Sequence, residues 1–219
     1  MINGIRLKIC GLTSLVDAGL ADEAGADYLG FVLHPESPRR VTLDQYRAMA
    51  SRLPDRRKVA VLVEPAGADL AAAAEAGFDF FQVHCRLETP AAAVAAWIEA
   101  VRRDRLWLAP RLPPAAELPV PLLGLVDTFL LDAYDERKFG GVGRLGDWMK
   151  FRRHREANSE KNWILAGGLA PENVGAALAA TGARWIDVNS GIERSPGVKD
   201  SAKLAALVAA LRGAAAPTT

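Results

Sequence analysis

Short apolar runs alternate with alanine-rich stretches along the whole chain, and this alternation predicts strands followed by helices. Residues 59–63 are apolar throughout, as expected for a strand that is covered on both of its faces. Read in this way, the apolar runs predict strands over residues 6–9, 28–33, 59–63, 78–83, 106–108, 128–131, 163–166 and 185–188.

The stretches between these runs begin and end at residues that favour helix termini. Thr42 is a good N-terminal cap, Gly77 is a typical stop, and Pro171 suits a first helical position. Residues 110–123 include five prolines, so we expect no regular helix there. The predicted helices cover residues 14–24, 42–52, 68–76, 90–103, 148–156, a segment from 171 onward, and 201–211.

Eight strand–helix units in 219 residues predict an α/β fold, a single-domain (β/α)8 or TIM barrel. A doubly wound open sheet shares this alternation and is the alternative, but the number of strands favours the barrel. The length supports one substantial core and is short for two domains. We therefore expect one barrel domain over residues 1–212 and a disordered tail over residues 213–219.

The composition narrows the possible partners. A net charge of +1 gives no reason to expect nucleic acid, and no apolar run reaches the roughly 20 residues of a membrane span. The first residues lack the basic and apolar segments of a signal peptide, so we expect a cytoplasmic protein. Its two cysteines, Cys10 and Cys85, fit a reducing compartment and cannot form a zinc site alone, so we expect no metal.

A thiol and a carboxyl group stand at the ends of two predicted strands. Cys10 follows the first strand and Asp132 follows the sixth, and in a barrel such positions converge on the active site. The pair could act as base and acid, although a buried packing thiol and a salt-bridge carboxylate are the simpler interpretations. A free thiol has a pKa near 8.5, so a thiol base needs a nearby cation. Lys8 lies two positions earlier, on the same face of the strand.

Glycine-rich stretches follow the last three strands, at residues 140–143, 167–168 and 189–191. Glycines let backbone N–H groups approach an anion, and barrels often bind phosphate after their last two strands. Turns need glycine in any case, but three such stretches in register with strand ends favour a phosphate site. Arg39 and His84 are further candidates, against the simpler interpretations of a solvated charge and a hydrogen-bonded core histidine.

These residues occur in an ordered series of motifs that resembles phosphoribosylanthranilate isomerase, an enzyme family of tryptophan biosynthesis. The resemblance runs from about residue 7 to residue 211. The motifs are KICGLT at 8–13, GAD at 25–27, GFV at 30–32, SPR at 37–39, QVH at 82–84, LLD at 130–132, GGVG at 140–143, DW at 147–148, AGGL at 166–169, PENV at 171–174, DVNSGIE at 187–193 and PGVKD at 196–200.

The resemblance implies an Amadori rearrangement of N-(5-phosphoribosyl)anthranilate without a cofactor. It implies that Cys10 is the base and Asp132 the acid, with the pKa of Cys10 lowered and that of Asp132 raised by burial. Arg39 would hold the anthranilate end. The substrate would also contact His84, and its phosphate would lie against Gly141, Gly143, Gly167, Gly168, Asn189, Ser190 and Gly191.

The chain departs from the family pattern at Glu64, Cys85, Arg111, Gly146 and Asn189, which leave Cys10, Arg39 and Asp132 in place. The departures keep two alternatives open. One is a related barrel isomerase that acts on another aminated phosphosugar, and the other is a phosphometabolite-binding protein without catalysis. In each case the partner is a small phosphosugar, and we expect a monomer or a weak homodimer.

Overall fold

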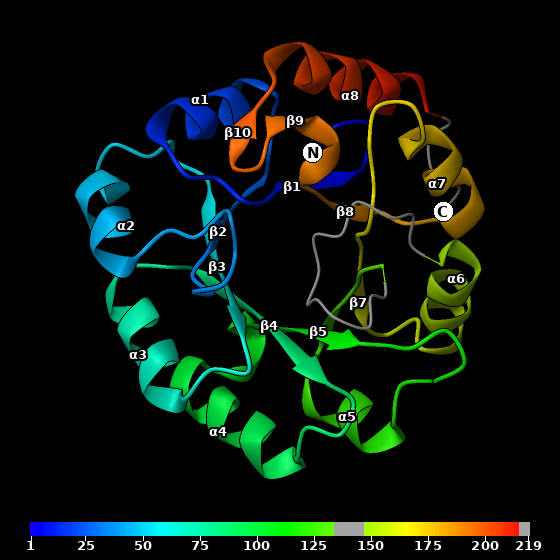
Figure 1. Cartoon of the computed structure of the whole chain (residues 1–219). Helices are drawn as coiled ribbons and strands as arrows, with labels where there is room; N and C mark the ends of the chain where they lie inside the picture. Colours follow the sequence, from blue (N-terminus) through cyan, green and yellow to red (C-terminus); the bar gives the residue numbers. More distant parts are fainter. Residues whose placement is uncertain (134–146, 215–219) are drawn as a thin grey trace.

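A closed barrel of parallel strands forms the centre of the molecule (Figure 1). The computed structural model describes residues 1–133 and 147–214. The first strand pairs with the last, Leu7 opposite Ile186, so the sheet is closed and the barrel prediction is confirmed over the open sheet. The strands are β1 (Arg6–Ile9), β2 (Tyr28–Val32), β3 (Arg57–Val63), β4 (Phe80–Arg86), β5 (Leu106–Arg111), β6 (Thr128–Leu131), β7 (Asn162–Leu165) and β8 (Trp185–Val188).

Helices surround the barrel on the outside, as Figure 1 shows. Thr42 caps the second helix as predicted and forms a capping box with Gln45, and Ser14, the first residue of the helix predicted over residues 14–24, caps the first helix. The helices are α1 (Leu15–Glu23), α2 (Leu43–Ala50), α3 (Gly67–Glu75), α4 (Ala91–Val101), α5 (Val120–Leu125), α6 (Trp148–Ala157), α7 (Val174–Thr181) and α8 (Ser201–Gly213), with short 3-10 turns η1 (Arg103–Arg105) and η2 (Ser190–Ile192).

Some predicted boundaries are wrong. The short helix α5 begins within the proline-rich segment, because Pro119 and Pro121 stand at its start, where a missing N–H costs nothing. The helix expected from Pro171 begins three residues later, after a turn closed by Asn173. The Asn173 side chain accepts from the N–H of Ala170 and donates to the carbonyl of Gly168. Helix α8 includes Gly213, the first residue of the expected tail, and residues 215–219 lie outside the described residues.

Two apolar layers form the core. One lies between the barrel and the helices, and the other fills the barrel interior. In the interior layer the Tyr28 ring stacks on Trp185 with centroids 4.9 Å apart, and Phe80 stacks on Trp107 at 5.0 Å. These four aromatic residues stand at or next to the first residue of their strands, so they close the amino-terminal half of the barrel. The open half is therefore at the carboxyl ends of the strands.

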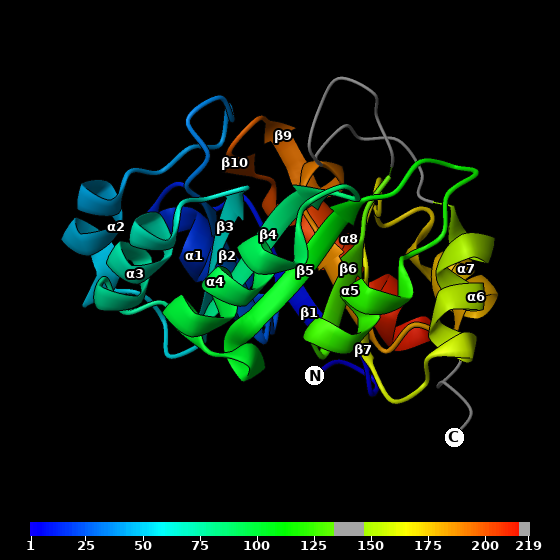
Figure 2. The ribbon, with the colours of Figure 1, turned by 90° about the horizontal axis from the view of Figure 1, so that it is seen from below.

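A small hairpin lies over this open half. Strands β9 (Glu193–Ser195) and β10 (Val198–Lys199) follow β8 and pair antiparallel. Figure 2 shows the hairpin at the end of the barrel toward which the strands run, while the N terminus lies at the opposite end. The sequence did not predict this hairpin. In the part of the chain that is described, no helix has the length and apolar character needed to cross a membrane.

Candidate active site

A buried ion pair lies beneath Cys10 at the junction of the first and last strands. Lys8 and Asp187 are register partners on β1 and β8, and Lys8 Nζ lies 2.9 Å from Asp187 Oδ2. The Lys8 side chain is 0% exposed. Cys10 follows directly on β1, and its backbone N–H donates to the carbonyl of Val188 at 2.9 Å. The lysine, the carboxylate and the thiol are thus gathered at one seam of the barrel.

Gly30 on β2 provides the space for this group. A Cβ atom at Gly30 would lie 3.0 Å from Cys10 Sγ, 3.0 Å from Lys8 Cε and 3.0 Å from Lys8 Nζ. Both side chains therefore reach the same small volume above Gly30, as expected for residues two apart on one strand. The prediction that Lys8 lies near the thiol is confirmed.

The predicted lowering of the Cys10 pKa is wrong for this structure. Burial, followed by the charge of Asp187, raises the pKa of the Cys10 thiol, while Lys8 and Lys199 act in the opposite direction. Burial also opposes the charge on Lys8, but the attraction of Asp187 and Cys10 outweighs it and raises the pKa of Lys8. Cys10 therefore rests as a neutral thiol beside a charged lysine.

His84 faces the barrel interior from β4. Its Nε2 atom lies 2.9 Å from Gln82 Nε2, two residues earlier on the same face. Burial and then the Lys8 charge lower the pKa of His84 to about 4, so the ring is neutral at pH 7. Its neighbour Cys85 points the other way, into the outer core, where burial raises its pKa to about 12. Cys85 is therefore not part of the pocket, and both cysteines are free thiols.

Arg39 is held by Glu193 of the hairpin. Arg39 Nη2 donates to Glu193 Oε2 at 2.7 Å, and Arg39 Nε donates to both carboxylate oxygens at 2.9 and 3.1 Å. Glu193 also accepts from Lys199 Nζ at 3.0 Å and from the N–H of Gly197 at 3.1 Å. Burial works against the Glu193 charge, but Arg39 and Lys199 outweigh it, and the pKa of Glu193 is lowered. Two cations and one anion leave this cluster with a surplus positive charge.

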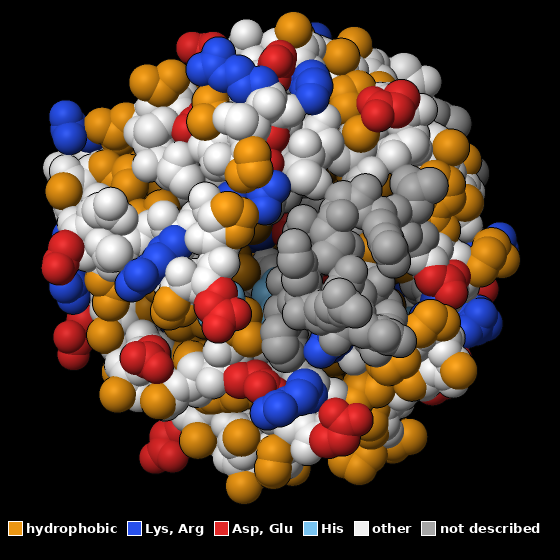
Figure 3. Space-filling view, in the orientation of Figure 1, with side chains coloured by type: hydrophobic (Ala, Val, Ile, Leu, Met, Phe, Trp, Pro, Cys, Tyr) orange, Lys and Arg blue, Asp and Glu red, His pale blue; other side chains and the backbone are white. Residues whose placement is uncertain are grey.

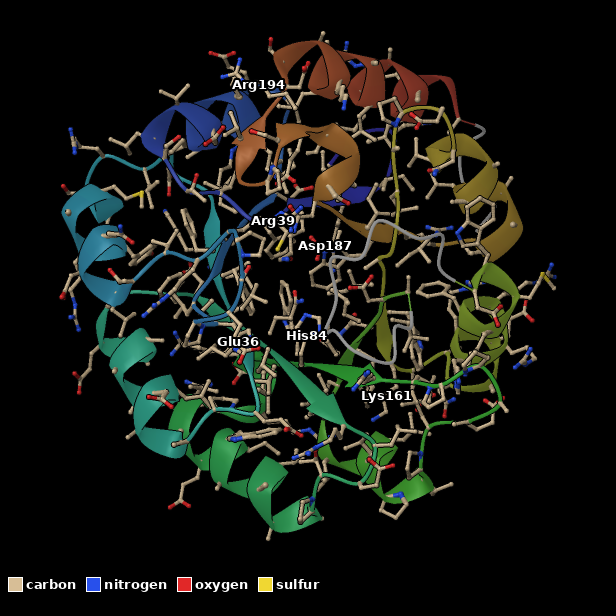
Figure 4. The ribbon with its side chains drawn as sticks, in the orientation of Figure 1. Glu36, Arg39, His84, Lys161, Asp187 and Arg194 are labelled. Carbon is tan, nitrogen blue, oxygen red and sulfur yellow. The ribbon has the colours of Figure 1, made fainter. Side chains whose placement is uncertain are left out.

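Gly11 and Asn189 connect the Arg39 cluster to Cys10. Gly11 has φ +71°, and a Cβ there would lie 2.7 Å from Arg39 Cδ and 2.6 Å from Asn189 Oδ1. That amide oxygen accepts from Lys199 Nζ at 3.0 Å. Figure 4 shows Arg39, Asp187 and His84 around the centre of the barrel mouth, and Figure 3 shows basic side chains close to the centre of the same face.

Asp132 lies after β6, beside the loop that follows β7. Its Oδ1 atom accepts from the N–H of Ala133 at 2.7 Å and lies 3.1 Å from the position of a Cβ on Gly167. Gly167 has φ +90° and Gly168 has φ +62°, a backbone that glycine adopts most easily. The structure thus brings Asp132 and this glycine pair together, as the sequence predicted.

The loops after β7 and β8 touch through their backbones. Ser190 and Gly191 lie in η2, where a Cβ on Gly191 would be 2.1 Å from the carbonyl oxygen of Leu169. Four of the predicted phosphate residues, Gly167, Gly168, Ser190 and Gly191, are therefore on neighbouring loops. Gly141 and Gly143 lie outside the described residues, as does Gly146.

Sequence reasoning overlooked several polar residues of this site, namely Gln82, Asp187, Glu193 and Lys199. A signal existed for Gln82 and Asp187, because each is a polar residue within an apolar strand, two positions before an expected site residue. The partners of Arg39 gave no such signal, since they lie in an unpredicted hairpin. Glu64 is also clear of the interior: its carboxylate binds Arg86 Nε at 3.0 Å and Thr89 Oγ1 at 3.1 Å.

Fold and site together define a (β/α)8-barrel protein with a polar site at the carboxyl ends of its strands. Residues 7–210 match the model of one family, described as N-(5'phosphoribosyl)anthranilate (PRA) isomerase. The match covers nearly the whole chain, and the chain belongs to this family.

Curated relatives and solved structures agree with the family match. The N-(5'-phosphoribosyl)anthranilate isomerase of Magnetococcus marinus is 40% identical, over 96% of this chain and 96% of the relative. That of Zymomonas mobilis subsp. mobilis is 36% identical, over 95% of this chain and 98% of the relative. The crystal structure of the Thermus thermophilus phosphoribosyl anthranilate isomerase is 33% identical and superposes with a TM-score of 0.79, covering 94% of this chain and 98% of the other.

Proposed function

We propose that this chain catalyses the Amadori rearrangement of N-(5-phosphoribosyl)anthranilate to 1-(2-carboxyphenylamino)-1-deoxyribulose 5-phosphate, a step of tryptophan biosynthesis. The observation that carries the proposal is the family match over residues 7–210, with Cys10 and Asp132 at strand ends of one barrel mouth. A family member 28% identical to this chain, with a TM-score of 0.74, has been solved with reduced 1-(o-carboxyphenylamino)-1-deoxyribulose 5-phosphate, covering 95% of this chain and 99% of that one.

Asp132 is proposed as the general acid that opens the sugar ring. Its carboxylic acid gives a proton to the ring oxygen as the bond between C1 and that oxygen breaks. The bond electrons stay on the oxygen, which becomes a hydroxyl, and the nitrogen lone pair forms a double bond to C1. Asp132 suits this step because it directly follows β6, in the same barrel mouth as Cys10.

Cys10 is proposed as the general base for the second step. Its thiolate takes the proton from C2, the C–H electrons form a double bond between C1 and C2, and the C1–N double bond reverts to an amine. The enol then returns its hydroxyl proton to Asp132 and receives the Cys10 proton at C1. Both residues regain their starting states, and because only protons move, we expect no cofactor and no metal.

The remaining contacts follow from charge and backbone geometry. We propose that Arg39, with the surplus charge of its cluster, binds the anthranilate carboxylate. We propose that the phosphate binds against Gly167, Gly168, Ser190 and Gly191. Gly141 and Gly143, which lie outside the described residues, are proposed to belong to the same site. Asn189 accepts from Lys199 of the Arg39 cluster and directly precedes Ser190, so we propose that it contacts the substrate, as does neutral His84.

The direct test is the loss of substrate fluorescence when freshly generated phosphoribosylanthranilate meets the purified protein. We expect rapid loss with wild type and with Cys85→Ala, and turnover lowered at least about 1,000-fold in Cys10→Ala. Cys85 is the matched control because it is the other buried cysteine and faces the outer core. A wild-type rate in Cys10→Ala would show that Cys10 is not the base. No loss of fluorescence with any of the proteins would refute the proposed activity.

Asp132→Asn tests the acid in the same assay. The variant keeps the shape of the side chain but cannot supply the proton, so we expect a similar loss of turnover with little change in melting temperature. Asp127→Asn is the control, because Asp127 lies on the exposed surface at the start of β6 and pairs with Arg103. Complementation of a strain that lacks the isomerase would separate this function from action on another aminated phosphosugar.

The oligomeric state is a separate proposal. A Thermotoga maritima relative is described as a dimeric phosphoribosylanthranilate isomerase from which monomers were generated. For this chain we propose a monomer or a weak homodimer, which light scattering over a range of protein concentrations tests directly.

A further inference from the structure

The buried ion pair beside Cys10 has no part in the chemistry proposed above. A fully buried lysine and a nearly buried aspartate are costly to place inside a protein, which raises the question of what they do there. Lys8 lies beside the residue proposed as the base, and the charge of Asp187 acts on that residue. The inference below rests on that proposed function, and it concerns how the thiol of Cys10 becomes ionised.

Lys8 is placed to stabilise a thiolate. Its Nζ and the Cys10 Sγ both lie 3.0 Å from the Cβ position of Gly30, so the ammonium group and the sulfur are neighbours. The lysine is sealed from solvent, and a charge in such surroundings acts with little screening. Ionisation of Cys10 therefore gains directly from the Lys8 charge.

Asp187 opposes this effect. One of its oxygens, Oδ2, accepts from Lys8 at 2.9 Å, and the other, Oδ1, has no hydrogen-bond partner among the described residues although it is buried. The carboxylate is therefore only partly satisfied, and its negative charge raises the pKa of the Cys10 thiol. It also holds the Lys8 ammonium group in an ion pair across the seam between β1 and β8.

We propose that Lys8 is the positioning residue that stabilises the thiolate of Cys10, and that Asp187 sets how much of the Lys8 charge reaches the sulfur. The thiol gives its proton to solvent on ionisation, and the thiolate then pairs with Lys8. Asp187 keeps the free protein mostly in the thiol form, which is the less readily oxidised one.

Among the residues that the structure describes, few other titratable groups act on Cys10. Lys199 on β10 acts on the thiol in the same direction as Lys8 but more weakly. His84 on β4 is neutral at pH 7 because burial, followed by the Lys8 charge, lowers its pKa to about 4. Arg39 and Glu193 neutralise each other in their ion pair, and β2 presents Gly30, which carries no charge. Lys8 and Asp187 are thus the pair to vary.

The experiment measures the rate of Cys10 alkylation by iodoacetamide as a function of pH, in a Cys85→Ala background so that one thiol remains. The pH at which this rate reaches half of its maximum is the alkylation midpoint. Lys8→Met removes the cation and leaves the Asp187 carboxylate alone with the thiol, so the alkylation midpoint rises and the alkylation rate at pH 7 falls about tenfold or more. Loss of the anion in Asp187→Asn lowers the midpoint and raises that rate. Lys150→Met, which removes another buried lysine, is expected to leave the midpoint unchanged.

The double variant Lys8→Met/Asp187→Asn keeps the test usable if the unpaired carboxylate prevents folding of the single variant. Its midpoint should lie above that of Asp187→Asn, because both proteins lack the carboxylate and differ only in the lysine charge. Shifts in the same direction for the two single variants, or no difference between Asp187→Asn and the double variant, would overturn the inference.

Turnover provides an independent readout. The acid limb of kcat/KM against pH reports the free enzyme's essential base, and it should move with the alkylation midpoint in each variant. Alkylation shifts without any turnover would support the ion-pair inference while refuting the proposed function. Normal turnover with unmoved alkylation midpoints would refute the inference alone.

Discussion

The carbonyl oxygen of Leu169 lies 2.1 Å from the point that a Cβ atom on Gly191 would occupy. No real Cβ atom comes so close to an oxygen, so the loops after β7 and β8 depend on glycine at this position. The two loops carry the residues proposed to bind the phosphate. The close packing of these two loops should therefore influence how tightly the substrate binds.

Gly191→Ala should therefore force the two loops apart. We expect KM to rise at least about tenfold with a smaller change in kcat, because the phosphate is a remote binding group whose contacts are lost. Steady-state kinetics measure both parameters. Gly124→Ala is the control, since a Cβ there meets nothing within 4 Å and alanine suits a helix better than glycine. An unchanged KM in Gly191→Ala would contradict the proposed phosphate position.

Gly30→Ala should disturb the base without disturbing the phosphate end. The new methyl group would press on Cys10 Sγ and Lys8 Nζ at 3.0 Å, and both must shift by a few tenths of an ångström. We expect kcat to fall about tenfold to a hundredfold, with KM little changed, because proton abstraction depends on placement to within an ångström. A kcat equal to that of wild type would show that the thiol position is uncritical.

His84 should make stability depend on pH in mildly acidic solution. Its folded-state pKa of about 4 lies below the ordinary value of 6.5, so between these values the unfolded chain binds the extra proton. Stability is therefore retained above pH 6.5 and falls as pH decreases toward 4, by about 3 kcal/mol in all. His84→Gln should lack this contribution. Urea unfolding of both proteins at pH 7 and pH 4 measures this contribution. An equal loss of unfolding free energy in wild type and in His84→Gln between the two pH values would contradict the prediction.

Glu193→Gln should weaken both the fold and the binding of the anthranilate end. Removing one partner of a buried ion pair costs about 3 kcal/mol at pH 7, and a loosened Arg39 should raise KM. Because the folded pKa of Glu193 is lowered, its contribution is present above the unfolded value and is lost as pH falls through the folded one. The difference in unfolding free energy between Glu193→Gln and wild type, measured with urea, should therefore become smaller at acid pH. Exposed Glu117→Gln is the control, with a change below about 1 kcal/mol.

Much of the fold follows from local pattern. Strands β1, β6 and β8 have the predicted limits, and the apolar runs of β6 and β8 end at the polar residues Asp132 and Asn189. Strand β5 runs three residues further than predicted, since Pro110 and Arg111 look unlike a strand but pair with Cys85 and Arg86 of β4. That pairing is a tertiary effect, and it overrides local preference.

The sequence predicted which strand ends carry the site residues, but it did not predict which residues these side chains pair with. Cys10, Asp132 and the glycines could be located because a barrel brings strand ends together. The partner of Arg39 is 154 positions away in the sequence, in a short hairpin that shows no pattern of alternating hydrophobic positions. The direction of the Cys10 pKa shift could not be predicted either, because it depends on how completely the thiol is buried and on a carboxylate across the barrel seam.

The stacked rings of Tyr28, Phe80, Trp107 and Trp185 divide the barrel into two compartments with separate tasks. Every described residue proposed to touch substrate lies on the carboxyl-terminal side of these rings, while the other side only has to hold the strands together. Substitutions on the amino-terminal side of these rings can therefore change the stability of the protein with little effect on its chemistry. Evolution, or a protein engineer, can alter one compartment while leaving the other as it is.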